Sequence, residues 1–229
     1  MHILIPAAGK GTRMGSDRNK LLLSLLDQTI LAWTLKAAAA SPSIQWIGIM
    51  GQPYDFPAFQ TIIDTLALAT PITLIQGGAT RQESVYRGLC ALPNDAEYVL
   101  IHDGARCLAT ADLFERCAAA FKDCNGFIAA IPVKDTIKVV TPGTRTIEAT
   151  PDRSQLWAAQ TPQGFHVPTL KQCHQQGQQN QWQVTDDAAL FEKCGLPVQI
   201  VTGEETNLKV TTPVDLAIAE FIVRSRLST

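Results

Sequence analysis

The chain begins its first strand and loop with Ile3-Leu4-Ile5-Pro6-Ala7-Ala8-Gly9-Lys10-Gly11-Thr12-Arg13-Met14-Gly15, and a further lysine follows at Lys20. An apolar run that passes into small residues and glycines predicts a strand followed by a turn. Glycines let the backbone of such a turn approach a ligand closely and point N–H groups at phosphate oxygens. This stretch therefore predicts a loop that binds a nucleoside triphosphate.

Two better-known phosphate loops do not fit this spacing. A P-loop needs Ser or Thr directly after its Gly-Lys pair, whereas Gly11 follows Lys10 here. The dinucleotide fingerprint G-x-G-x-x-G also fails, because Gly15 comes one residue too late after Gly9 and Gly11. What remains resembles the signature of nucleotidyltransferases that join a nucleoside triphosphate to a sugar or polyol phosphate.

Local charge supports phosphate binding over the alternative, an ordinary glycine-rich turn. Lys10, Arg13, Arg18 and Lys20 fall within eleven positions and are opposed only by Asp17, in a chain whose formal net charge is −2. Positive side chains beside exposed N–H groups suit an anion.

Composition limits the class of protein. With 229 residues, of which 46% are hydrophobic and 17% charged, the chain suits one domain over residues 1–229. No apolar run is long enough to span a membrane, and the pI near 6.1 argues against a nucleic-acid partner. The six cysteines form no C-x-x-C pair and the first residues have no leader pattern, so we expect reduced thiols and a cytoplasmic location.

Short β-branched runs alternate with helical patterns, which predicts an α/β fold with a mainly parallel sheet flanked by helices. We expect strands at 2–6, 45–50, 72–75, 98–101, 127–133 and 198–201. We expect helices at 30–40, 57–69, 81–92, 111–122, 186–193 and 213–226.

One region, at about 134–160, interrupts this alternation. Extended segments flank the turn Thr141-Pro142-Gly143-Thr144, which predicts a hairpin arm that protrudes from the sheet. Such an arm could cover the active site or pair with another subunit. The alternative is a surface hairpin with no function.

Three further clusters follow predicted strands, where open α/β sheets bind their ligands. In residues 76–84, paired glycines and Ser84 could read a base edge or a ribose, or form only the turn before a helix. In residues 102–106, Asp103 could bind a metal, a ribose or a substrate hydroxyl, or form a structural pair with Arg106. The third cluster is divided between Arg153 and Lys209, and either side chain alone could be an ordinary surface charge.

Together, seven motifs resemble the 2-C-methyl-D-erythritol 4-phosphate cytidylyltransferase family and occur in its order over nearly the whole chain. They are Pro6-Ala7-Ala8-Gly9-x-Gly11-x-Arg13-Met14 with Lys20, Gly77-Gly78-x-x-Arg81-x-x-Ser84, His102-Asp103-x-Ala105-Arg106, Pro132-Val133-x-Asp135-Thr136, Thr161-Pro162-Gln163, Val184-Thr185-Asp186-Asp187 and Asn207-Leu208-Lys209-Val210-Thr211. The resemblance implies a Rossmann-like nucleotidyltransferase domain, a homodimer that exchanges contacts through the β-arm, and a step of isoprenoid precursor biosynthesis.

The resemblance also implies roles for individual residues. Arg13 and Lys20 would stabilise charge on the triphosphate, and Arg153 and Lys209 would position methylerythritol phosphate. The residues implied in CTP binding are Pro6, Ala7, Ala8, Gly9, Gly11, Gly78, Ser84, Asp103, Gly104 and Ala105. The acceptor would be contacted by Asp103, Thr136 of the partner subunit, Arg153, Thr161 and Lys209. Two departures from the family, Gly104 for alanine and Cys107 for proline, predict a more flexible loop there.

The expected reaction is attack by the acceptor phosphate on the α-phosphorus of CTP with release of pyrophosphate. A phosphate monoester is largely a dianion at neutral pH, so no general base is needed. We expect Mg²⁺ to arrive on the CTP phosphates, with no protein metal ligands. The rival functions are a related cytidylyltransferase, such as one for ribitol phosphate, and a catalytically silent nucleotide-binding protein. Retention of Arg13 and Lys20 argues against the second rival.

Overall fold

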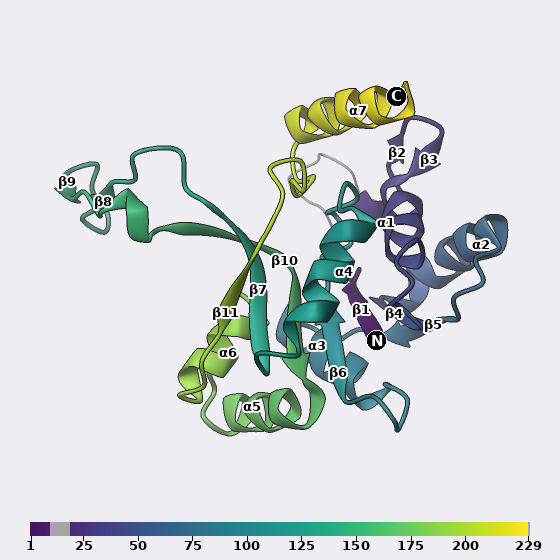
Figure 1. Ribbon diagram of the computed structural model, residues 1–229, viewed down its shortest axis with the longest axis horizontal. Coiled ribbons are helices and arrows are strands. Elements are labelled where there is room, and N and C mark those ends of the chain that lie inside the picture. Colours follow the sequence, from purple (N-terminus) through teal and green to yellow (C-terminus); the bar gives the residue numbers. More distant parts are fainter. Residues whose placement is uncertain (10–18, 229) are drawn as a thin grey trace.

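The computed structural model describes residues 1–9 and 19–228, and a seven-stranded sheet lies at its centre (Figure 1). The strand order is β11-β7-β10-β6-β1-β4-β5. These strands are β1 (His2–Pro6), β4 (Trp46–Gly51), β5 (Ile72–Gln76), β6 (Tyr98–Ile101), β7 (Gly126–Pro132), β10 (Trp157–His166) and β11 (Gln199–Thr202). All six strands expected from the sequence are present, with ends that differ by at most one residue.

One strand of this sheet runs against the others. β10 pairs antiparallel with both β6 and β7, whereas β1 pairs parallel with β4 and β6. The register of β10 shifts between Ala159 and Gln163, around the cis peptide bond between Thr161 and Pro162. The sequence indicated an extended run only to residue 160, within the arm, but the strand continues through the middle of the sheet.

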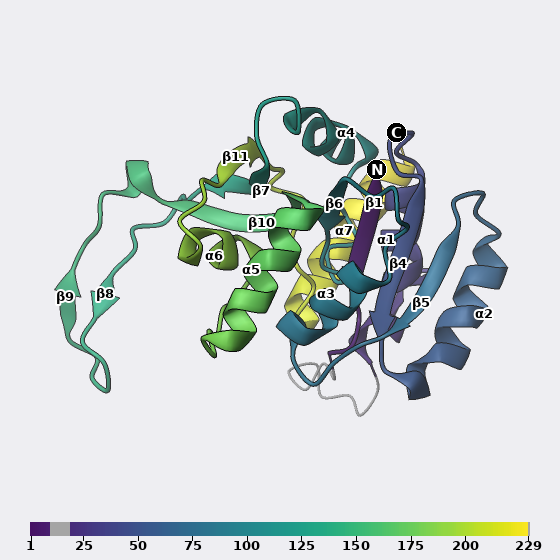
Figure 2. The same cartoon turned by 90° about the horizontal axis from the view of Figure 1, so that it is seen from below.

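Helices cover both faces of the sheet (Figure 2). On one face pack α1 (Ile30–Ala39), α2 (Phe56–Leu66), α4 (Ala111–Ala120) and α7 (Pro213–Leu227); on the other pack α3 (Arg81–Cys90), α5 (Val167–Gln179) and α6 (Asp187–Lys193). In β1, Ile3 and Ile5 enter the first core and Leu4 enters the second, all with no exposed surface. Alternate residues of a strand face opposite sides, so a strand covered on both sides is apolar throughout.

Capping residues define several helix starts. Thr212 caps α7 by accepting from the backbone N–H of Asp215, whose carboxylate accepts from the N–H of Thr212 in return. Thr80 likewise caps α3, but the carboxylate of Glu83 accepts from Ala79 and not from Thr80. α5 was not expected from the sequence.

The arm protrudes far from the helices and the sheet (Figures 1 and 2). It carries the short hairpin of β8 (Val139–Val140) and β9 (Ile147–Ala149) and the 3-10 helix η4 (Arg153–Gln155). Its large apolar side chains are exposed: Ile137, Val139, Val140, Ile147 and Trp157. The predicted hairpin excursion is therefore present.

In the part of the chain that the structure describes, no helix is both long and apolar enough to cross a membrane.

Candidate active site

A cavity of about 660 Å³ opens beside the carboxyl ends of β1, β5 and β6. It gathers residues from four separate sequence motifs. The predicted site residues that line it are Pro6, Ala7, Ala8, Gly9, Lys20, Gly78, Ser84, Asp103, Gly104, Ala105 and Lys209. Gly11 and Arg13 lie outside the described residues. The cavity thus joins the predicted nucleotide loop to Lys209.

Lys20 is held at the edge of this cavity by its neighbour Asn19. Asn19 is buried and caps the 3-10 helix η2 (Lys20–Leu22) by accepting from the N–H of Leu21 at 3.0 Å. Its amide nitrogen donates to the carbonyl of Ala7 at 2.7 Å and to the carboxylate of Asp55 at 2.9 Å. These bonds tie the start of η2 to the end of β1. The Lys20 ammonium then donates to the carbonyl of Val210 at 3.2 Å, next to Lys209.

The Gly77-Gly78 turn is shaped by the Ser84 hydroxyl. Ser84 Oγ accepts from the N–H of Gly78 at 2.9 Å and donates to the carbonyl of Thr80 at 2.8 Å. A Cβ on Gly78 would lie only 2.4 Å from side-chain atoms of Glu83, so glycine is required for this close approach. In this turn, Gly78, Ala79 and Thr80 line the cavity.

Asp103 lies among three basic side chains. Its Oδ2 is 2.7 Å from the ammonium of Lys209 and 3.9 Å from Nε of Arg106, and its Oδ1 is 4.0 Å from Nε of Arg81. Burial alone would raise the pKa of Asp103, but Lys209 and Arg81 outweigh it and lower the pKa below its ordinary value. Asp103 is therefore an anion that faces the cavity, where it can accept hydrogen bonds from hydroxyl groups.

Arg81 is a cavity residue to which sequence reasoning assigned no role. Its Nη1 lies 2.7 Å from Oδ2 of the buried Asp187, whose Oδ1 is 3.2 Å from Nε2 of His174. Burial opposes the charge of Arg81, but Asp187 and Asp103 raise its pKa above the ordinary value. The pair forms between α3 and the start of α6, so no local sequence pattern could have revealed it.

The loop after β6, for which the sequence predicts greater flexibility, is tied by hydrogen bonds to α1 and to the segment before α7. The carbonyl of Gly104 accepts from the Thr34 hydroxyl at 2.8 Å, and the carbonyl of Ala105 accepts from the N–H of Val210 at 2.8 Å. A Cβ on Gly104 would come within 2.7 Å of Leu21 Cδ1. Glycine at position 104 therefore lets the loop pack closely against Leu21.

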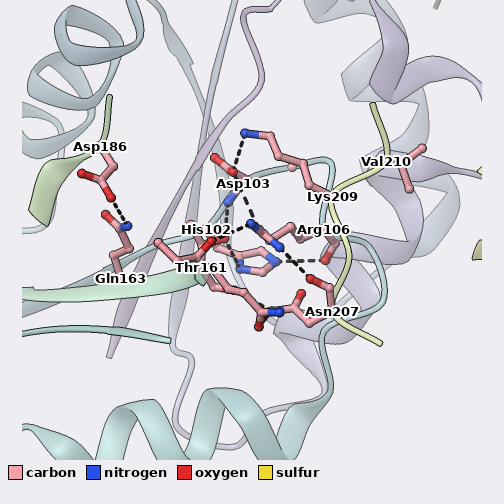
Figure 3. A network of polar contacts seen from close by, with 12 residues as sticks. His102, Asp103, Arg106, Thr161, Gln163, Asp186, Asn207, Lys209 and Val210 are labelled. Atoms are coloured by element: carbon pink, nitrogen blue, oxygen red, sulfur yellow. Dashed lines mark hydrogen bonds and ion pairs between the residues drawn. The ribbon is translucent and has the colours of Figure 1, made fainter. Parts of the chain in front are cut away.

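Thr161 lies directly behind Asp103 and is 4% exposed. Its hydroxyl oxygen accepts from the N–H of Asp103 at 2.9 Å (Figure 3). The side chain is not among the described residues that line the cavity.

Arg153 and Thr136 lie on the arm and do not line the cavity in the described part of the chain. Arg153 Nη1 donates to the carbonyl of Lys134 at 2.6 Å, and the side chain lines a separate hollow of about 450 Å³ with Trp157. Thr136 is exposed. The predicted partnership of Arg153 with Lys209 is therefore not formed within one chain.

Carboxylates are scarce among the described residues that line the cavity. Among the described residues, no group of three His, Cys, Asp or Glu side chains could hold a metal ion. Asp103 is the one carboxylate among the described residues that line the cavity, and Lys209 already pairs with it. Mg²⁺ prefers near-octahedral oxygen ligands, which phosphates and water can supply.

A protein-family comparison identifies this arrangement. Residues 1–225 match the model of the family described as 2-C-methyl-D-erythritol 4-phosphate cytidylyltransferase. The chain belongs to the 2-C-methyl-D-erythritol 4-phosphate cytidylyltransferase family. Enzymes of this family transfer CMP from CTP to 2-C-methyl-D-erythritol 4-phosphate, and this chain is such a cytidylyltransferase. The products are 4-diphosphocytidyl-2-C-methyl-D-erythritol and pyrophosphate, in isoprenoid precursor biosynthesis.

Individual relatives agree with the family. The chain is 67% identical over 228 residues to the cytidylyltransferase of this name from Crocosphaera subtropica, with 100% of each chain covered. It is 65% identical over 226 residues to that from Synechocystis sp., with 99% of this chain and 98% of the relative covered.

Solved structures show the same fold. The 4-diphosphocytidyl-2C-methyl-D-erythritol synthase from Anaerococcus prevotii superimposes with a TM-score of 0.86 at 28% identity, covering 97% of each chain. The cytidylyltransferase from Thermus thermophilus gives 0.80 at 31% identity, covering 97% of this chain and 98% of that one. The predicted Rossmann-like nucleotidyltransferase fold and the predicted activity are both confirmed.

Proposed function

We propose a division of labour within residues 1–229, taken as a single nucleotidyltransferase domain with an arm at about 134–160. The N-terminal loop, with Gly9, Gly11 and Arg13, binds the CTP phosphates together with Lys20. The Gly78 to Ser84 turn reads cytosine, and Asp103 to Ala105 contact the ribose. The observation that carries the proposal is one cavity lined by both Lys20 and Lys209, which has room for a nucleotide and an acceptor side by side.

The acceptor phosphate is held by Lys209, and Asp103 orients the acceptor through its hydroxyl groups. As a dianion at neutral pH it attacks the α-phosphorus of CTP without a general base. Lys20 and Arg13 stabilise the negative charge that develops on the transferred phosphoryl group and on pyrophosphate. Cations that are positioned before the reaction begins lower its barrier most effectively.

A Mg²⁺ ion bound to the triphosphate would neutralise part of its charge. Asp103 is the one carboxylate among the described cavity residues, so most ligands of such an ion would come from the nucleotide and water.

The arm serves a neighbouring subunit. Exposed Ile137, Val139 and Val140 offer apolar surface for pairing, and an exposed hairpin of this kind is a ready interface. The arm then carries Thr136 and Arg153 to the acceptor in the partner's cavity. We propose that this homodimer is cytoplasmic and has neither a membrane nor a nucleic-acid partner.

Lys20→Met tests the phosphate-binding assignment. Removal of one donor to a developing charge lowers kcat by about 100-fold or more. Pyrophosphate release is measured with saturating CTP, Mg²⁺ and acceptor, and circular dichroism monitors folding. A near-normal kcat would show that Lys20 does not stabilise the reacting phosphates.

Acceptor choice is tested by the same assay with ribitol phosphate in place of methylerythritol phosphate. We expect turnover with the methylerythritol ester alone, and comparable rates with both would make the acceptor pocket unselective.

A further inference from the structure

His102 lies beneath the loop that carries Asp103 and has no exposed surface. It follows β6 directly, and its backbone N–H donates to the carbonyl of Leu4 at 2.9 Å. Its ring meets Phe114 of α4 edge to face, with centroids 5.0 Å apart. Main-chain and ring contacts therefore fix the imidazole in one orientation.

Both ring nitrogens have partners, and the partners decide where the proton lies. Nε2 is 3.1 Å from the carbonyl oxygen of Arg106, which can only accept. Nε2 must then carry the hydrogen. Nδ1 is 3.1 Å from Oγ1 of Thr161. Burial lowers the pKa of His102 to about 4, so the ring is neutral at pH 7 and Nδ1 accepts a hydrogen bond.

The hydroxyl of Thr161 lies between His102 and Asp103 and contacts both (Figure 3). Its one hydrogen is donated to His102 Nδ1, and its oxygen accepts from the N–H of Asp103. We call this chain of hydrogen bonds the relay. The backbone N–H of Arg106 in turn donates to the carbonyl of Asp103 at 2.9 Å. The imidazole and the hydroxyl thus fasten both ends of the turn between Asp103 and Arg106.

The same network reaches the segment that carries Lys209. The amide nitrogen of Asn207 donates to the carbonyl of Thr161 at 2.9 Å. Arg106 Nη1 donates to the carbonyl of Asn207 at 2.6 Å. The two sides of the Asp103–Lys209 ion pair are consequently held by one connected set of buried and partly buried hydrogen bonds.

We infer that His102, as a neutral Nε2–H tautomer acting through the Thr161 hydroxyl, is a positioning residue that sets the Asp103–Lys209 pair for the acceptor phosphate. This inference rests on the proposed function only in that Asp103 and Lys209 serve the acceptor. Thr161 then influences the acceptor through Asp103.

The tautomer is measured directly on the full-length wild-type enzyme. Long-range proton–nitrogen correlation spectra of the imidazoles, with His102 assigned by comparison with His102→Gln, should show a neutral ring at pH 7 protonated on Nε2. A ring protonated on Nδ1, or on both nitrogens, would overturn the inference, because the Thr161 hydroxyl would then have no acceptor at His102.

The kinetics of Thr161→Ser and Thr161→Val distinguish the effect of the hydroxyl group from the effect of side-chain shape. Valine matches threonine in shape but lacks the relay, and we expect kcat/KM for methylerythritol phosphate to fall about tenfold or more, as for a misplaced reacting group. Serine keeps the hydroxyl and should restore most of that loss. CTP affinity, titrated without acceptor, should follow the same order, falling in the valine variant and recovering in the serine variant, because Asp103 is also assigned to the ribose.

Equal losses in the serine and valine variants would mean that the methyl group matters through packing, and normal acceptor kinetics in the valine variant would mean that the relay does nothing; either result overturns the inference. Lys209→Met is measured in parallel. If this variant has unchanged acceptor kinetics, the role proposed for Lys209 is wrong. The tautomer of His102 and the difference between the serine and valine variants still test the relay independently.

Discussion

The ammonium nitrogen of Lys209 lies 2.7 Å from Oδ2 of Asp103, although one residue precedes α7 and the other follows β6. This pair places a cation and an anion side by side in the cavity. The cation suits the acceptor phosphate, and the anion suits hydroxyl groups of the acceptor or of ribose. The roles of Lys209 and Asp103 can therefore be distinguished by how a substitution of each changes the binding of the two substrates.

Lys209→Met should lower kcat/KM for methylerythritol phosphate by about 100-fold, because the group that holds the nucleophile is lost. CTP affinity should change little. Asp103→Asn should weaken the binding of both CTP and the acceptor, since the carboxylate is assigned to both substrates. Steady-state kinetics and CTP titration by calorimetry measure the two effects, and Lys193→Met, an exposed lysine on α6, is the matched control. Loss of CTP binding with normal acceptor kinetics in Lys209→Met would place Lys209 in the nucleotide site.

Hybrid dimers test the assignment of the arm. Lys209 lines the cavity, whereas Arg153 lies on the arm. If the arm serves the partner's cavity, a dimer of one Lys209→Met subunit and one Arg153→Met subunit has one site that carries both lesions and one site with neither. Mixing the two inactive variants under conditions that exchange subunits should then restore activity.

If Arg153 acts within its own chain, every site in the hybrid dimer keeps one lesion and mixing restores nothing. Sedimentation of the wild-type protein gives the accompanying control, and a fully active monomer would defeat the arm assignment.

Much of the fold follows from sequence patterns because both faces of the central strands are buried. The apolar runs at His2–Pro6 and Tyr98–Ile101 became β1 and β6 with the expected bounds. Helix α5 was missed because its sequence is rich in glutamine and has few apolar residues to mark a face. β10 was cut short because Pro162, which has no N–H, interrupts the strand pattern.

The candidate site could be predicted where its residues follow one another in a motif, as in Pro6 to Gly9 and in Asp103 to Ala105. Contacts between distant segments could not. Arg81 meets Asp187 across two helices, and Thr161 meets His102 only because β10 lies beside β6. Such pairs have no local periodicity, so the topology of the sheet must be known before they can be found.

Ser84→Ala should weaken CTP binding and reduce the preference for CTP over UTP. The hydroxyl holds the N–H of Gly78 and the carbonyl of Thr80, and a buried polar group left without its partner costs about 1–3 kcal/mol. The turn that faces the base would lose its fixed shape. The ratio of kcat/KM values for CTP and UTP measures this effect. Thr61→Ala, which removes an exposed helical hydroxyl bonded to Pro57, is the control. An unchanged ratio would mean that this turn does not read the base.

The stability of the protein should depend on pH through the buried His102. Its pKa is about 4 in the folded protein and 6.5 as an ordinary histidine, because burial disfavours the charged ring. Between these values the unfolded chain binds more protons than the folded one. Stability must therefore rise with pH through this window and fall as the pH drops from about 6.5 to about 4, by up to about 3 kcal/mol.

Urea unfolding at a series of pH values measures this slope, and His102→Gln should flatten it, because glutamine does not titrate. His2, whose pKa is also lowered by burial, leaves a residual slope of the same sign. The carboxylates of Asp103 and Asp187 have pKa values below 3.8, so their stabilisation is lost mainly at lower pH. His166→Gln, at the partly exposed end of β10, is the matched control. If His102→Gln and wild type show the same slope between pH 4 and 6.5, the ring is not held neutral by burial and the direction assigned to the Thr161 hydrogen bond loses its physical basis.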